Sequence, residues 1–272
     1  MRRVLIVGAG QAGLQLALTL QAERYDVTLI STRTPEQIRS GHVMSTQSMY
    51  YQTLEIERRH GLGLWDDTAP QLTGLRMSVA NPGGERDIDW MAPLKDYALS
   101  IDQRVKMPAW LELFAERGGT IDYRWLSVAD LDEMAPDFDL VVVAAGKGEL
   151  GSLFERHAQR SPYTEPQREL SVAYVRGTHN SSAPDDSSAA RFNALAGIGE
   201  VISYPGHTLD GACEILLLEG VPGVSWTPSA TGPSRSGSGI GCSACCASTA
   251  RGSSTGSPGP SSPTRARPWP VR

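Results

Sequence analysis

Long apolar runs are missing from this sequence of 272 residues, and no segment approaches the roughly 20 apolar residues that a membrane-spanning helix needs. Basic residues are also too few to balance the acidic ones, 25 against 30. The resulting net charge of −5 argues against a nucleic acid or an anionic membrane surface as a partner. The amino terminus begins on a strand-like run at 3–7 and shows no signal-peptide cleavage pattern. We therefore expect a cytoplasmic location.

Cysteine and histidine are scarce and lack the spacings of metal sites. Three of the four cysteines fall within positions 242–246, and no second C-x-x-C pair or histidine follows them. These cysteines do not make a disulfide framework. The five histidines lie far apart along the chain. No acid–base pair has convincing spacing either, so neither a metal ligand nor a catalytic residue is assigned.

The last 50 residues, 223–272, lack leucine, lysine, aspartate and glutamate altogether. They contain 12 Ser, 8 Gly and 7 Pro. Apolar residues do not recur in it at helix or strand spacing, so the segment cannot bury enough apolar surface to offset the entropy cost of ordering its backbone, about 1–2 kcal/mol per residue. We expect it to be a disordered tail. It is either a natural low-complexity extension or an out-of-frame read-through of a GC-rich gene, and the ratio of 22 arginines to 3 lysines favours the second origin.

A strand, a glycine-rich turn, a helix and a second strand follow one another near the amino terminus. The apolar run at 4–7 is typical of a buried parallel strand, and a helical pattern begins at residue 14. Between them, Gly8, Gly10 and Gly13 form a G-x-G-x-x-G motif. The first glycine permits a tight turn, the second lets the backbone approach a pyrophosphate, and the third lets the helix pack on the strand. This order predicts a dinucleotide site at the helix amino terminus.

The second strand, at 26–30, is not followed by the acidic residue that usually binds a ribose hydroxyl. Ser31, Thr32 and Arg33 stand there instead. The hydroxyl groups can replace the carboxylate in part. Arg33 can meet the 2′-phosphate of NADP or lie in a solvated loop. An NADP-dependent oxidoreductase is therefore one alternative that the motif leaves open.

A second G-x-G-x-x-G match spans residues 146–151, after an apolar strand expected at 138–145. Gly146 would end that strand at the carboxyl edge of the sheet, where a nucleotide binds in this class of fold. The sequence beyond the match does not lead into another strand–helix unit. A second dinucleotide site is therefore the less favoured interpretation.

The remaining patterns complete an α/β fold. Helices are expected at 45–60 and 102–116, and strands at 120–125, 170–175, 200–204 and 214–218. The alternating residues 72–90 predict a β-hairpin around a turn cluster. We expect a Rossmann-like domain of residues 1–71 and 96–150, and an inserted, mainly β subdomain of residues 72–95 and 151–222.

Several segments, taken in order, resemble the oxygenase component of styrene and indole monooxygenases, a branch of the flavin-dependent aromatic hydroxylases. They are the motif at 8–13 and residues 100–104, 114–119, 139–147 and 148–177. The resemblance covers residues 1–222. It implies that the Rossmann-like domain binds FAD and that the β subdomain binds a small aromatic alkene or an indole-like substrate. It also implies that a separate NADH-dependent flavin reductase supplies reduced FAD.

The resemblance implies roles for single residues as well. Arg104 is expected to approach the FAD phosphates, and Thr46 and Gln47 are expected near the flavin. In this family one oxygen atom passes to an alkene as an epoxide, or to indole, and the flavin carries the chemistry. The protein shields the flavin from water and places the substrate. Association into a homodimer is left open.

The sequence departs from the family at two points. Thr32 stands where the family has an acidic residue after the second strand. The family's later Gly-Asp and Pro-x-x-Gly-x-Gly motifs, which hold the flavin ribityl chain and the pyrophosphate, do not occur. An incomplete flavin pocket, weak FAD binding or poor folding is therefore expected. A non-catalytic nucleotide-binding remnant is the alternative to an enzyme.

Overall fold

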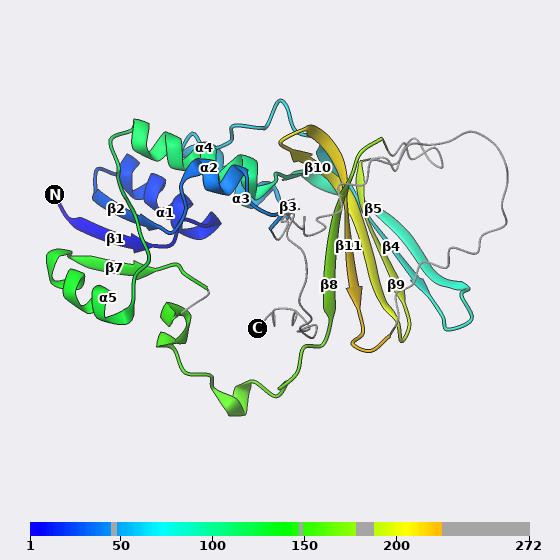
Figure 1. Cartoon of the computed structure of the whole chain (residues 1–272). Helices are drawn as coiled ribbons and strands as arrows, with labels where there is room; N and C mark the ends of the chain where they lie inside the picture. Colours follow the sequence, from blue (N-terminus) through cyan, green and yellow to red (C-terminus); the bar gives the residue numbers. More distant parts are fainter. Residues whose placement is uncertain (45–47, 147–148, 178–187, 225–272) are drawn as a thin grey trace, which may run out of the picture.

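A computed structural model describes residues 1–44, 48–146, 149–177 and 188–224 of the chain. These residues form two sheets that lie side by side (Figure 1). A four-stranded parallel sheet with helices occupies the side of the amino terminus. A seven-stranded sheet of long strands occupies the other side. The predicted α/β class is confirmed.

The parallel sheet has the strand order β6-β2-β1-β7. Its strands are β1 (Arg3–Val7), β2 (Asp26–Ser31), β6 (Thr120–Tyr123) and β7 (Leu140–Val143). The helices of this half are α1 (Gln11–Ala22), α2 (Pro35–Arg39), α3 (Tyr51–Arg59), α4 (Gln103–Glu116) and α5 (Val128–Met134). Short 3-10 helices lie at η1 (Ala135–Asp137), η2 (Glu149–Leu153) and η3 (Ala158–Arg160).

Strand β1 is buried on both faces, which explains why its sequence is continuously apolar. Val4 and Ile6 belong to a core that includes residues of α1, α2 and α4. Leu5 and Val7 point to the opposite face and belong to a core that includes residues of α5 and η2. The sheet is therefore the middle layer between two groups of helices. Its carboxyl edge is left for the loops that follow the strands.

The larger sheet has the order β3-β5-β4-β9-β10-β11-β8. Its strands are β3 (Ser48–Met49), β4 (Gln71–Ala80), β5 (Arg86–Ser100), β8 (Glu169–Val175), β9 (Ala189–Leu195), β10 (Gly199–Thr208) and β11 (Gly211–Gly220). All neighbouring pairs are antiparallel except β4 and β9. The predicted hairpin at 72–90 corresponds to β4 and β5.

The end of β5 connects the two sheets. Ile101 forms a parallel bridge with His207 of β10, and the Asp102 N–H donates to the His207 carbonyl over 2.8 Å. The next residue begins α4, which packs in the core of the parallel sheet. The start of α4 is therefore fixed by both halves of the molecule.

Two element predictions were wrong in extent. The helix expected at 45–60 begins only at Tyr51, because Ser48 and Met49 pair with β5 as strand β3. Strand β5 continues to Ser100 and so extends beyond residue 90, where the predicted hairpin ended. Strand β9 was not predicted, although residues 190–194 alternate between apolar and polar side chains. The tail from residue 225 onward lies outside the described residues.

Across the described ranges, none of the helices combines the length and the apolar character that crossing a bilayer requires.

Candidate functional site

The turn after β1 requires glycine at its first position. Gly8 has a φ of 117°, a region that residues with a side chain rarely adopt. Its N–H donates to the Ile30 carbonyl over 3.0 Å, which joins the ends of β1 and β2. A Cβ atom at Gly8 would lie 2.8 Å from the Ala144 carbonyl oxygen. The turn is therefore packed directly on the segment that follows β7.

Gly13 lies where α1 touches the same turn. A Cβ atom at this position would lie 1.9 Å from the Gly8 carbonyl oxygen, which is far inside van der Waals contact. Glycine is thus required for the close approach of the helix to the turn. This role agrees with the one predicted for the third glycine of the motif.

Gly10 differs from the other two because it faces open space. It is exposed, it is the N-cap of α1, and a Cβ atom there would meet nothing within 4 Å. No side chain caps the helix at this residue, and no acidic residue lies in the first turn. The first N–H groups of a helix have no intrahelical acceptor and carry a partial positive charge. Residues 8–13 therefore fit a dinucleotide pyrophosphate.

The parallel sheet brings the other predicted residues to the same edge. The Ala144 N–H donates to the Val7 carbonyl over 2.8 Å, so the segment that leads to Gly146 starts beside the glycine turn. Ser31 ends β2, the neighbour of β1 on the other side. Since carboxyl ends of adjacent parallel strands share one edge, Gly8, Ser31 and Gly146 follow neighbouring strand ends.

The three residues after β2 are placed differently from one another. Ser31 is buried, and its hydroxyl donates to the Arg33 carbonyl over 2.7 Å. That hydroxyl is engaged in the local turn. Thr32 is exposed at the strand end. Arg33 is also exposed, with Nη2 3.3 Å from the Met44 sulfur. Thr32 therefore offers the more accessible hydroxyl.

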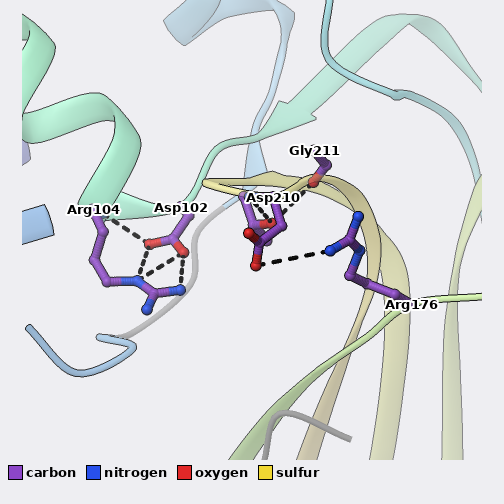
Figure 2. Close-up of polar contacts among 6 residues, drawn as sticks. Asp102, Arg104, Arg176, Asp210 and Gly211 are labelled. Atoms are coloured by element: carbon purple, nitrogen blue, oxygen red, sulfur yellow. Dashed lines mark hydrogen bonds and ion pairs between the residues drawn. The ribbon is translucent and has the colours of Figure 1, made fainter. Parts of the chain in front are cut away.

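Arg104 lies in the first turn of α4 and folds back onto Asp102, as Figure 2 shows. Its Nη2 atom lies 2.6 Å from Asp102 Oδ2, and its Nε lies 3.0 Å from the same oxygen. The Asp102 side chain is 1% exposed and the Arg104 side chain 19%. Asp102 raises the pKa of Arg104, which keeps the guanidinium charged. The Nη1 group takes no part in this contact and suits an anion.

A tyrosine and a cysteine with raised pKa values lie near this ion pair. Burial and nearby Asp102 raise the pKa of the Tyr174 hydroxyl above its usual range. Burial also raises the pKa of the Cys213 thiol to about 11. Arg176 and Asp210 form a second ion pair shown in Figure 2, with Arg176 Nη1 3.9 Å from Asp210 Oδ2. Thr46 and Gln47, the other residues expected near the flavin, lie outside the described residues.

Removing the Asp102 carboxylate is expected to destabilise the fold. Asp102 is the N-cap of α4, accepts from the Arg104 N–H over 2.8 Å and is buried beside a charged guanidinium. Asp102→Ala should lower the free energy of unfolding by about 2–3 kcal/mol, measured by urea unfolding. Asp102→Asn keeps a good capping oxygen, so it should lose less. Equal losses in both variants would show that the cap contributes nothing.

Sequence reasoning missed a buried polar group at the base of the site. Gln11, the first residue of α1, donates from Nε2 to Glu57 Oε1 over 2.9 Å. Lys106 Nζ lies 2.6 Å from the same oxygen. One signal was present: Lys106 is one of three lysines and stands beside Met107 in an otherwise apolar helical stretch.

The second G-x-G-x-x-G match, at 146–151, is followed by a helix that is too short to bind a pyrophosphate as α1 can. The residues after Gly146 form η2 (Glu149–Leu153), a 3-10 helix of five residues. Residues 147 and 148 lie outside the described residues. Within the described ranges, no three histidine, cysteine or acidic side chains are grouped so as to hold a metal ion.

Most of this chain is similar in sequence to a curated protein. Over 218 residues it is 31% identical to styrene monooxygenase StyA of Pseudomonas fluorescens. The match covers 80% of this chain and 51% of that protein, so the chain spans about half the length of the curated relatives it matches. Residues 146–234 also match the family model described as "Styrene monooxygenase A putative substrate binding domain".

Solved structures with the same fold include two flavin-dependent enzymes. The flavin-dependent halogenase CmlS has a TM-score of 0.56 at 18% identity, covering 80% of this chain and 41% of its own. Aklavinone-11 hydroxylase, solved with FAD and aklavinone, has a TM-score of 0.51 at 17% identity, covering 80% and 45%. At such identities these likenesses concern the fold alone. The resemblance predicted from the sequence is confirmed: this chain is a relative of styrene monooxygenase StyA with the fold of flavin-dependent halogenases and hydroxylases.

Proposed function

We propose that this chain binds FAD and forms the cofactor- and substrate-binding part of a two-component, flavin-dependent monooxygenase of the styrene monooxygenase type. One observation carries the proposal. The helix α1 opens on Gly10, which leaves space at an uncapped helix amino terminus, at the carboxyl edge of a parallel sheet. Similarity to StyA over the same residues selects FAD among the dinucleotides that such a site accepts.

In this proposal the residues divide the cofactor between them. The N–H groups at the start of α1 hold the pyrophosphate, with Gly8 and Gly13 giving the turn its shape. Thr32 meets the adenosine ribose, and Arg104 contributes a positive charge near the phosphates. Bound and reduced, FAD supplies the transfer of one oxygen atom from O2 to the substrate. The chain's part is to hold the flavin, exclude water and orient the substrate.

The substrate surface that we propose lies on one face of the larger sheet. Cross-strand neighbours put five apolar side chains on this face, one from each of five adjacent strands: Trp90, Met77, Phe192, Ile202 and Leu217. The face continues into the buried cluster around Tyr174 and Tyr204. Apolar and aromatic side chains suit a small aromatic alkene or an indole-like molecule. Residues 72–95 and 151–222 are thus proposed to bind the substrate, and residues 1–71 and 96–150 to bind FAD.

The same proposal extends to partners and location. A separate NADH-dependent flavin reductase would deliver reduced FAD, and both proteins would work in the cytoplasm. A second copy of the chain is a further proposed partner.

Two measurements on the purified full chain test the function. The first compares binding of FAD with binding of NADPH. The second supplies NADH, a flavin reductase and styrene or indole, and looks for oxygenated product by chromatography. FAD binding with product supports the monooxygenase. Binding of FAD without product indicates a nucleotide-binding remnant. Binding of NADPH without flavin would replace the proposal by an NADP-dependent oxidoreductase.

A further inference from the structure

A buried ion pair lies directly beneath the start of α1. Glu57 of α3 and Lys106 of α4 are each 2% exposed, and Lys106 Nζ lies 2.6 Å from Glu57 Oε1. The same carboxylate oxygen accepts from Gln11 Nε2 over 2.9 Å. Lys106 Nζ also lies 4.5 Å from the centre of the Trp110 ring. Three helices are thus joined at one carboxylate.

This pair is costly as a device for stability alone. Both charges are removed from water, and a buried pair often does no better than apolar side chains of the same size. Burial lowers the pKa of the Lys106 amine, although Glu57 acts in the opposite direction. A pair of this kind is better suited to fix a geometry than to strengthen a core.

The geometry that it fixes is that of the dinucleotide site. Gln11 is the first helical residue after Gly10, so its side chain tethers the turn whose N–H groups face the open space. Lys106 lies two residues after Arg104 on α4. The carboxylate therefore sets the first turn of α1 against the first turns of α4. Both turns carry groups assigned above to the cofactor phosphates.

The charge of the pair matters as much as its contacts. A buried carboxylate one hydrogen bond from the start of α1 opposes the positive end of that helix. Lys106 balances the carboxylate at 2.6 Å. Without the lysine, Glu57 would lower the electrostatic potential where an anionic pyrophosphate must bind, and it would still hold Gln11.

We propose that Glu57 and Lys106 are a positioning pair for the cofactor site: Glu57 anchors Gln11 and the first turn of α1 against α4, and Lys106 keeps that anchor neutral toward the FAD pyrophosphate. The proposal rests on the FAD site proposed above. It gives a role in cofactor affinity to Glu57, which lies 46 positions from Gln11 and 49 positions from Lys106 in the sequence.

The test compares FAD affinity, by titration of flavin fluorescence, in three variants of the full chain. Lys106→Met leaves the carboxylate unbalanced and should weaken FAD binding at least tenfold. Glu57→Gln with Lys106→Met restores neutrality and keeps an oxygen for Gln11, so it should bind within threefold of the parent. Gln11→Ala cuts the tether without leaving a buried charge unpaired and should weaken binding about fivefold.

A matched control removes an ion pair elsewhere. Arg168→Met breaks the pair with Glu200 (2.8 Å) at the larger sheet and should leave FAD affinity unchanged. Single and double variants that lose affinity equally would show that the pair only packs, and Lys106→Met with parental affinity would also overturn the proposal. If Lys106→Met fails to fold, Gln11→Ala decides: parental affinity in that variant overturns the tether.

Amide hydrogen exchange in residues 11–15 separates this proposal from the FAD site itself. Exchange there should be faster in Lys106→Met and in Gln11→Ala than in the parent, and parental in the double variant. If the parent binds no FAD, the proposed function fails while this pattern still shows that the pair positions α1. Unchanged exchange in all variants contradicts the positioning role whatever the cofactor.

Discussion

Gly13→Ala is expected to destabilise the protein severely. The added Cβ atom would lie 1.9 Å from the Gly8 carbonyl oxygen and 3.2 Å from the Ala144 Cβ. The first neighbour is backbone and the second is the Cβ of a short side chain, so neither can swing aside, and α1 must move off the sheet. Alanine favours a helix over glycine by about 1 kcal/mol, but the displaced core outweighs that gain. We expect a net loss of about 3 kcal/mol in urea unfolding.

Gly10→Ala is the matched control for this loss. It places the same methyl group in the same motif, three residues earlier, where a Cβ atom meets nothing within 4 Å. Its free energy of unfolding should stay within about 1 kcal/mol of the parent, since only the N-cap preference changes. If Gly13→Ala unfolded at the same urea concentration as Gly10→Ala, the close contact between the turn and α1 would be wrong.

Gly10→Val should strongly weaken FAD binding and leave the fold intact. The position is exposed, and its φ of −86° and ψ of −172° are extended values that valine adopts readily. The valine methyl groups would fill the space at the helix amino terminus that the pyrophosphate is proposed to enter. We expect FAD affinity to fall at least about 100-fold, which corresponds to about 2.7 kcal/mol. Calorimetric titration with FAD measures this fall.

Ala115→Val, the control, also introduces the two methyl groups of valine, here at an exposed site near the end of α4. It should keep parental FAD affinity. The unfolding midpoint of Gly10→Val should also match that of the parent, so that lost binding is not lost folding. Parental affinity in a folded Gly10→Val variant would place the cofactor elsewhere.

Local patterns predicted the part of the site that is built locally. The strand at 4–7 and the helix after the glycines follow from neighbours in the sequence. Gly8, Gly10 and Gly13 lie between the end of β1 and the first turn of α1, and their role in cofactor binding stays a prediction. Strand β9 shows the limit. Its residues, Ala189–Leu195, alternate over only five positions after a polar stretch of sequence, and the strand forms by pairing with β4 on one side and β10 on the other. Such pairing depends on chain segments that no short window contains.

The same limit applies to single side chains. The Ser31 hydroxyl donates to the carbonyl of Arg33 two residues away, a local turn that sequence spacing alone does not reveal. Glu57 and Lys106 meet across 49 positions. Glu57 resembles an ordinary surface charge in its own helix, and the apolar neighbours of Lys106 do not show which residue it meets. Helix α3 starts at Tyr51, later than the predicted residue 45, because β3 pairs with Leu99 and Ser100, about 50 residues away.

A comparative titration of the full chain with FAD, FMN and ADP tests the proposed site most directly. If α1 binds the pyrophosphate, FAD binds, ADP competes with it, and FMN, which lacks the pyrophosphate and adenosine, binds at least about tenfold more weakly. Binding of FMN as tight as that of FAD, or folded protein that binds neither FAD nor ADP, would contradict a FAD site at the amino terminus of α1.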